Sequence, residues 1–166
     1  MDTQLYIDAM HAKGVADAKD LQERSGKMDG TALYAEENKI PEFAAAVKVK
    51  NMLQRKAAQA DGFVCRNSLG QVCRLIQAYD SDIYTQEPGS IELAAHWRFV
   101  WSTDPKKAKP FLEEAGLRST NFYNKDECCT FNGHVWQSLI AANTYTPVEY
   151  PGGWKDLGTI ESVITE

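Results

Sequence analysis

The chain has 166 residues, of which 43% are apolar and 25% charged, and its formal net charge is −5. This length fits one ordinary domain or two to three very small ones, and the apolar fraction is too high for a disordered chain. The acidic balance predicts no nucleic-acid partner, because a polyanion is recognised by a basic surface.

The sequence also predicts no association with a membrane. The longest apolar run covers the five residues 43–47, far fewer than the roughly 20 residues that span a bilayer. The first ten residues, MDTQLYIDAM, carry an acid where a signal peptide begins with basic residues. We therefore expect a soluble protein that is made in the bacterial cytoplasm without a signal peptide.

The helices are predicted in the first 60 residues. Thr3–Lys13 has one apolar side and Gly14 as a stop signal, and a second helix covers Asp17–Ser25. This helical hairpin resembles a helix-turn-helix DNA reader in outline. The second helix, however, carries Asp20 and Glu23 among its basic residues. It is therefore interpreted as a solvated surface rather than a phosphate-binding one.

A connector over 27–40, with a turn signal at Asp29-Gly30, leads to a third predicted helix. Pro41 opens this helix, since proline is tolerated at the first helical position, and the helix covers 43–60. It lacks the sustained heptads of a coiled coil. We expect it to pack across its own domain, with self-association into a homo-oligomer as the weaker alternative.

From Phe63 onward the chain carries short strand signals and an internal repeat. In each copy a glycine turn is followed by a strand, a Tyr-Thr pair and a tryptophan. Copy one contains NSLGQVCRLIQA (67–78), Tyr84-Thr85 and Trp97, and copy two contains NGHVWQSLIAA (132–142), Tyr145-Thr146 and Trp154. The recurrence in one order predicts a duplication.

Each copy predicts a hairpin followed by a third strand. Asn132-Gly133 is a strong type I′ turn signal that joins Cys128–Phe131 to His134–Ala141. In copy one, the longer turn 67–70 joins Phe63–Arg66 to Gln71–Ala78.

The expected fold class is α+β, with a short helical N-terminal segment followed by two small antiparallel three-stranded β-modules. Its predicted divisions are a helical docking segment at 1–60, module one at 61–100, a connecting segment at 101–118 and module two at 119–160. Within the connecting segment, Asp104–Pro110 is expected to form a short helix or an ordered loop.

The four cysteines are interpreted as reduced thiols that pack as small hydrophobes. The adjacent Cys128 and Cys129 are poorly placed to bridge each other. The more specific alternative is a zinc site made of Cys128, Cys129 and His134. These residues lack the C-x2-C spacing of such sites. We therefore expect neither a metal nor another cofactor.

The aromatic residues of the repeat are the part of the sequence that indicates a binding function. A module of thirty-odd residues buries little area, so some ring surface is expected to stay exposed. Exposed Trp and Tyr rings offer rigid apolar contact to the flat C–H faces of sugars. The alternative is that each tryptophan fills the core of its own module, which is favoured for Trp136, whereas Trp101 is expected to pack between segments. The candidate glycan-binding residues are Tyr84, Trp97, Tyr145, Tyr150, Trp154 and Trp136, with Tyr79 in support.

The stretch FNGHVWQSLIAANTYTPVEYPGGWKDL resembles chitin-binding-type carbohydrate-binding modules of family 5/12, particularly those of bacteriophage and prophage tail-region proteins. Copy one departs from the pattern at Cys73 and Gln86. The segments 32–43 and 96–111 resemble parts of small proteins encoded beside tail-fibre and lysis genes in clostridial prophages. The resemblance implies a virion component of the tail that binds a host cell-surface polysaccharide through its aromatic face, beside other tail or baseplate proteins.

Two other functions compete with this expectation. A structural tail or baseplate subunit would use the same aromatics against a protein neighbour. A coplanar exposed pair of rings would favour sugar, and an apolar patch continuous with the 43–60 helix would favour a protein. An enzyme is not expected, because a glycosidase needs two carboxylates across a cleft. Glu149 and Asp156 lie near the aromatics of copy two without a cleft-forming framework.

Overall fold

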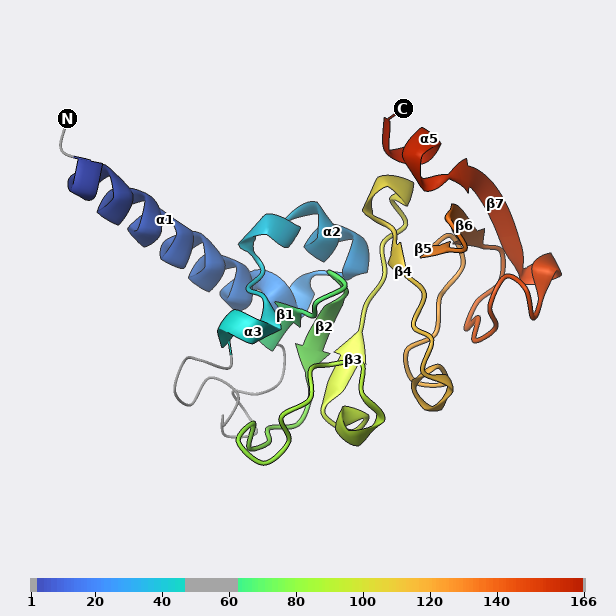
Figure 1. Cartoon of the computed structure of the whole chain (residues 1–166), viewed down its shortest axis with the longest axis horizontal. Coiled ribbons are helices and arrows are strands. Elements are labelled where there is room, and N and C mark those ends of the chain that lie inside the picture. The colour runs from blue at the N-terminus through green and yellow to red at the C-terminus, as the bar shows by residue number, and fades with distance from the viewer. Residues whose placement is uncertain (1–2, 47–62, 166) are drawn as a thin grey trace.

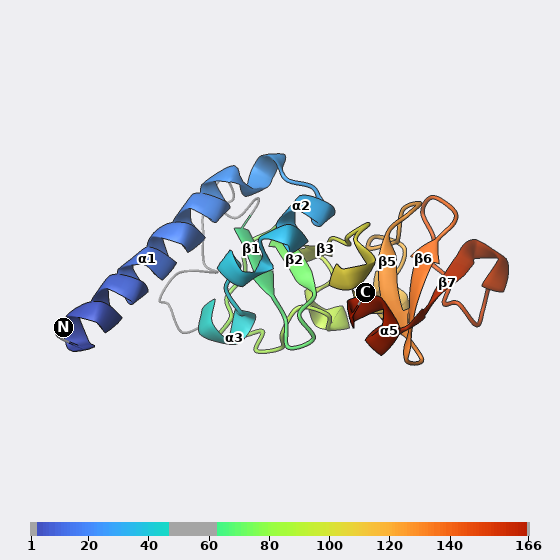
Figure 2. The same ribbon diagram turned by 90° about the horizontal axis from the view of Figure 1, so that it is seen from above.

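The computed structural model describes residues 3–46 and 63–165. A long N-terminal helix leads to a three-stranded sheet, and a four-stranded sheet lies beside it (Figure 1). The two sheets occupy opposite halves of the body in the perpendicular view as well (Figure 2). The predicted α+β class is confirmed. Within the described part of the chain, every helix is too short or too polar to cross a membrane.

The two predicted N-terminal helices are one continuous helix, α1 (Thr3–Arg24). Gly14 does not stop it, because a glycine inside a helix costs only about 1 kcal/mol. An ion pair between Lys13 Nζ and Asp17 Oδ2, at 2.7 Å, spans that glycine on the helix surface. The beginning of α1 extends away from the rest of the chain (Figure 1), whereas Leu21 near its end is fully buried.

The predicted connector contains a helix that the sequence analysis missed, α2 (Gly30–Ala35). Asp29 caps its N-terminus, with Oδ1 accepting a hydrogen bond from the Ala32 N–H at 2.8 Å. A 3₁₀ turn, η2 (Glu37–Lys39), leads to α3 (Phe43–Ala46). The helix predicted over 43–60 therefore begins near its expected place, and its remainder lies outside the described residues.

The first sheet has the antiparallel order β1-β2-β3. Its strands are β1 (Phe63–Arg66), β2 (Val72–Leu75) and β3 (Trp97–Phe99). The free edge of β1 is held by the N-terminal segment. The Gln22 side chain bonds both the N–H and the C=O of Val64, at 3.0 and 2.7 Å, and the Arg66 N–H donates to the Pro41 carbonyl at 2.9 Å.

The second sheet has four strands rather than the predicted three. They are β4 (Lys109–Pro110), β5 (Cys128–Phe131), β6 (His134–Ser138) and β7 (Trp154–Thr159), followed by α5 (Ile160–Thr165). The extra strand β4 comes from the predicted connecting segment, after the 3₁₀ turn Pro105–Lys107, and pairs in parallel with β5. The hairpin turn is as predicted, with φ of 49° at Asn132 and 78° at Gly133.

One core extends across both sheets and the segment between them. Trp101 stacks on Tyr123 with ring centroids 4.4 Å apart, and Tyr123 stacks on Phe111 at 5.3 Å. The buried aromatic members of this cluster are Phe43, Phe63, Tyr79, Trp97, Phe99, Trp101, Phe111, Tyr123 and Trp154. Trp97 and Trp154 are buried because the two halves share a core, whereas Tyr84, Tyr145 and Tyr150 keep exposed ring surface, as expected of small modules. The module boundaries and the duplication stay predictions.

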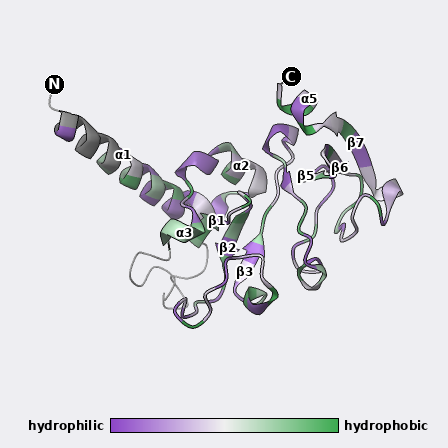
Figure 3. Ribbon diagram, in the orientation of Figure 1, coloured by the Kyte–Doolittle hydropathy of each residue, from purple (hydrophilic) through white to green (hydrophobic). Residues whose placement is uncertain are grey.

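The first sheet is covered on both faces. Alternate residues of β1 and β2 point to opposite sides, so Cys65 and Cys73 face the shared core, whereas Val64 and Val72 face the N-terminal segment. There the Tyr34 hydroxyl accepts from the Val72 N–H and donates to the Val100 carbonyl, both at 2.9 Å. Both hydrophobic and hydrophilic residues occur along the two sheets (Figure 3).

All four cysteines are free and buried. Cys129 belongs to the shared core, whereas Cys128 packs in a small cluster with Val135 and Val163 on the other face of the sheet. His134 Nδ1 lies 2.9 Å from Asp156 Oδ1. Because their side chains face opposite ways, Cys128 and Cys129 are not placed to bind one zinc ion together. The residues that the structure describes contain no cluster of three potential metal ligands.

Candidate functional site

Two exposed tyrosines form an aromatic corner in the loop between β6 and β7. Tyr145 is 52% exposed and Tyr150 is 45% exposed. Their ring centroids are 5.6 Å apart and the ring planes meet at 69°. The pair is therefore not the coplanar platform that was expected to favour sugar, but two rings in edge-to-face contact.

Buried hydrogen bonds fix the backbone of this loop. The fully buried Asn143 donates from Nδ2 to Ser138 Oγ and to the Gly153 carbonyl, each at 3.1 Å. Its Oδ1 accepts from the Tyr145 N–H at 3.2 Å. One amide side chain thus ties the start of the loop to its end, which holds Tyr145 in place.

Trp154 lies beneath the corner rather than in it. It is only 4% exposed, and its indole N–H donates to the Tyr145 carbonyl at 3.0 Å. Trp97 is likewise 2% exposed, and its indole N–H donates to the Tyr79 hydroxyl at 3.2 Å. Neither of these two candidate residues therefore presents its ring at the surface. The core alternative holds for both, because the shared core encloses their rings.

Gly153 sets the position of the Tyr150 ring. A Cβ at this residue would lie 2.7 Å from Cδ1 of Tyr150 and 3.3 Å from Nδ2 of Asn143. A Cβ at the neighbouring Gly152 would meet the same ring at 3.5 Å, an ordinary contact. The absence of a side chain at Gly153 therefore allows the ring to rest on the backbone.

We expect Gly153→Ala to displace the Tyr150 ring and to lower the free energy of unfolding by about 1–2 kcal/mol, because the added methyl overpacks this contact. Shifts of the Tyr150 ring signals in NMR spectra and urea unfolding measure the two effects. Gly152→Ala is the matched control and should leave the ring signals nearly unchanged. Unchanged Tyr150 signals in the Gly153 variant would contradict the assignment.

An ion pair lies beside the aromatic corner. Arg118 Nη1 is 3.1 Å from Oε2 of Glu149, and the Arg118 guanidinium also lies over the Phe111 ring at 5.1 Å. The Thr146 N–H donates to Glu149 Oε2 at 2.7 Å, and the Glu149 N–H donates back to Thr146 Oγ1 at 3.0 Å. The Thr146 N–H and then Arg118 hold the pKa of the Glu149 carboxyl below its usual value.

A hollow of about 520 Å³ adjoins these groups. Ligand pockets commonly measure about 300–1,000 Å³, so this space can admit a ligand of one or a few small rings. It is lined by Ala115, Arg118, Ser119, Thr144, Tyr145 and Glu149. Tyr145 and the Arg118–Glu149 pair therefore line one concave surface, and the Tyr150 ring contacts Tyr145 beside it.

The remaining predicted site residues lie elsewhere. Tyr84 is 44% exposed in the β2–β3 loop, where its ring contacts those of Tyr79 and His96 at centroid distances of 6.5 and 6.2 Å. Trp136 is half-buried beside His134, and its indole N–H donates to the Phe131 carbonyl at 3.0 Å. Of the six predicted residues, the described ring contacts bring together only Tyr145 and Tyr150.

The sequence analysis missed Arg118 and Asn143. Arg118 is 31 residues away from Glu149 along the chain, so no local pattern links the two. Asn143 has no signal beyond its place just before the Tyr-Thr pair of copy two. A Gly-Gly pair ahead of a tryptophan was the visible clue to the close approach at Gly153.

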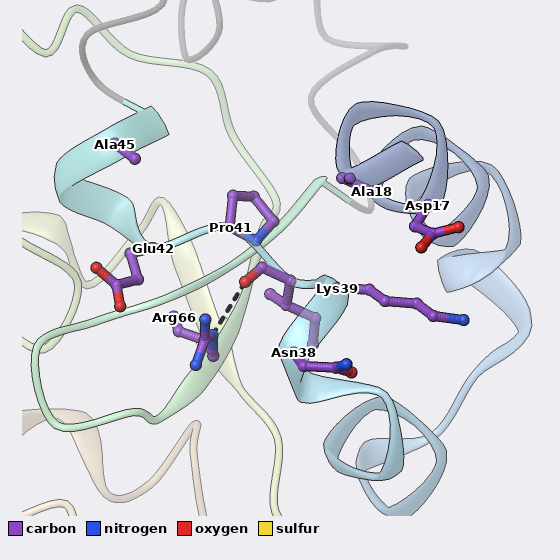
Figure 4. Close-up of a pocket in the computed structure, with 10 residues that line it drawn as sticks. Asp17, Ala18, Asn38, Lys39, Pro41, Glu42, Ala45 and Arg66 are labelled. Carbon is purple, nitrogen blue, oxygen red and sulfur yellow. Dashed lines mark hydrogen bonds between the residues drawn. The ribbon is translucent and has the colours of Figure 1, made fainter. Parts of the chain in front are cut away.

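A second hollow, of about 330 Å³, lies among α1, η2, α3 and β1 (Figure 4). Its lining mixes both charges, with Asp17 and Glu42 opposed by Lys39 and Arg66. Arg66 is already engaged there, since its Nε donates to the Ile40 carbonyl at 3.0 Å. This hollow lacks the exposed rings of the aromatic corner and is not assigned a ligand.

The aromatic corner is thus the place where exposed rings, a fixed ion pair and a concave surface coincide. Its interpretation rests on the geometry of this chain. Compared with protein-family models, curated proteins and solved structures, the chain gives no match.

Proposed function

We propose that the chain is a non-catalytic, phage tail-associated protein that binds a cell-surface glycan through Tyr145 and Tyr150. The observation that carries the binding role is the exposed aromatic corner beside the Arg118–Glu149 pair. A sugar places its C–H face on one ring and its edge against the other, and its hydroxyls pair with the guanidinium and the carboxylate. The tail association rests on the sequence resemblance.

The charges of the corner favour an uncharged glycan. Arg118 is compensated by Glu149 at 3.1 Å, so the pair supplies donors and acceptors without a net charge. Because the tyrosine rings meet at 69° rather than lying in one plane, we propose contact with a single sugar residue rather than with two successive ones. A neutral polysaccharide bound one residue at a time is the ligand class that follows.

We expect the double variant Tyr145→Ala/Tyr150→Ala to bind insoluble chitin or purified Gram-positive cell walls about tenfold or more weakly than the unchanged chain, because it loses both ring contacts. Co-sedimentation with each polysaccharide, over a range of protein concentrations, measures the affinity. Val148→Ala is the matched control, since Val148 lies in the same loop and is 69% exposed. Circular dichroism verifies that each variant is folded.

Undiminished binding by the folded double variant would place the site elsewhere. Failure of the unchanged chain to bind any of these polysaccharides would overturn glycan binding itself. That second outcome favours the other candidate, a structural subunit of the tail or baseplate. The observation behind this candidate is α1, which projects from the body and is therefore accessible to a neighbouring protein (Figure 1).

A further inference from the structure

Two cysteines of the first sheet face each other across a strand pair. Cys65 on β1 is the direct register partner of Cys73 on β2. Their Sγ atoms are 3.7 Å apart, and both side chains are fully buried in the shared core. The aromatic corner uses neither residue, so their juxtaposition has no part in the proposed glycan site.

The backbone at this position is compatible with a disulfide. Directly opposite residues of an antiparallel pair have Cα atoms about 4.5–5.5 Å apart, inside the range of about 4.4–6.8 Å seen in disulfides. The sulfurs would close from 3.7 Å to about 2.05 Å, which side-chain rotation can supply. Cys128 and Cys129 form no such pair with each other, because they face opposite sides of the second sheet.

We propose that Cys65 and Cys73 are an oxidation site that forms a cross-strand disulfide when the chain meets a low-molecular-weight disulfide such as oxidised glutathione. One cysteine loses its proton to solvent and attacks a glutathione sulfur, whose S–S bond breaks to release one glutathione thiolate. The second cysteine, also deprotonated, then attacks the protein sulfur of the mixed disulfide and releases the other. Two protein thiols are oxidised and one glutathione disulfide is reduced to two glutathione thiols.

Burial controls when this reaction occurs. Removal from water raises the pKa of the Cys73 thiol, and neither sulfur is exposed, so the oxidant reaches them only in molecules whose β1–β2 hairpin has opened. Once formed, the bond fastens β1 to β2. Because β1 also carries the contacts to Gln22 and Pro41, the bond would secure the strand on which the N-terminal segment is held.

The test equilibrates the full chain with mixtures of reduced and oxidised glutathione, in urea low enough to keep it folded and high enough to let the hairpin open. Acid quenching, trypsin digestion and non-reducing mass spectrometry then locate the bonds. Trypsin cuts after Arg66 and Arg74, so the bond links the peptides AAQADGFVCR (57–66) and NSLGQVCR (67–74). We expect the equilibrium constant for this bond to be about tenfold or more higher in the folded chain than in denaturing urea.

Matched variants make the result specific. Cys128→Ser and Cys129→Ser should still give the linked peptide pair, whereas Cys73→Ser should abolish it. If the serine variant fails to fold, Cys73→Ala and Cys65→Ala serve the same purpose with no buried hydroxyl. The proposal is overturned if the folded and denatured chains form the bond equally well, or if the folded chain links Cys65 or Cys73 to another cysteine instead.

Discussion

Trp154→Ala is expected to lower the free energy of unfolding by about 3–5 kcal/mol, as large-to-small changes of buried aromatic residues do. The Trp154 ring is 4% exposed and packs edge-on against Tyr123 and Phe111, at centroid distances of 5.4 and 6.2 Å. Its loss also leaves the Tyr145 carbonyl without the indole donor. Urea unfolding monitored by circular dichroism measures the effect.

Tyr150→Ala is the control for this experiment, because Tyr150 lies in the same loop but is 45% exposed. Its stability loss should not exceed about 1 kcal/mol, because much of the Tyr150 ring is already in contact with water. Trp154→Phe separates packing from hydrogen bonding, since it keeps an aromatic ring and removes the indole N–H. A loss below about 1 kcal/mol for Trp154→Ala would show that this ring is not part of the core.

Gly30→Ala is expected to be strongly destabilising, by about 3 kcal/mol, although alanine is the better helix former. A Cβ at Gly30 would lie 2.0 Å from the carbonyl oxygen of Trp101 and 2.8 Å from its nitrogen. These are backbone atoms, so the contact cannot be relieved by turning a side chain, and α2 would have to move away from the sheet. Urea or thermal unfolding measures the loss.

Gly14→Ala is the control, and we expect it to raise the free energy of unfolding rather than lower it. A Cβ at Gly14 would meet no atom within 4 Å, and Gly14 lies inside α1. Because alanine has the higher helix propensity, this change should stabilise α1 by about 0.5–1 kcal/mol. A Gly30→Ala variant as stable as the unchanged chain would mean that α2 does not pack against Trp101 as described.

Local sequence signals placed both hairpins, although the second strand of each is shorter than predicted, at Val72–Leu75 instead of 71–78 and at His134–Ser138 instead of 134–141. The type I′ turn at Asn132-Gly133 has the expected positive φ angles, and β1 and β5 have the predicted bounds. Local signals failed where the competing energies are small. The isolated Gly14 suggested the end of a helix. A glycine inside a helix costs only about 1 kcal/mol, however, and the hydrogen bonds of a continuous helix outweigh this cost. The connector was expected to lack a helix, although Asp29 is a favourable cap.

The candidate site was predictable only in part. Tyr145 and Tyr150 were recognised because exposed tyrosines in a Pro/Gly-rich loop differ from core residues in their setting. Arg118 joins them from the connecting segment, where no local pattern marks it. Trp97 and Trp154 were given two open roles, ligand contact or core, because the sequence does not reveal how much neighbouring chain covers a ring.

By itself, the sequence determined the α+β class, the positions of the hairpins and an aromatic content concentrated in the second half. These features follow from turn chemistry and from the alternation of side chains along strands, both of which act between near neighbours. Tertiary structure decided which aromatic rings stay at the surface. The two halves share one core, so Trp154 is buried by Phe111 and Tyr123 from outside its own hairpin, and Tyr145 is left exposed above it.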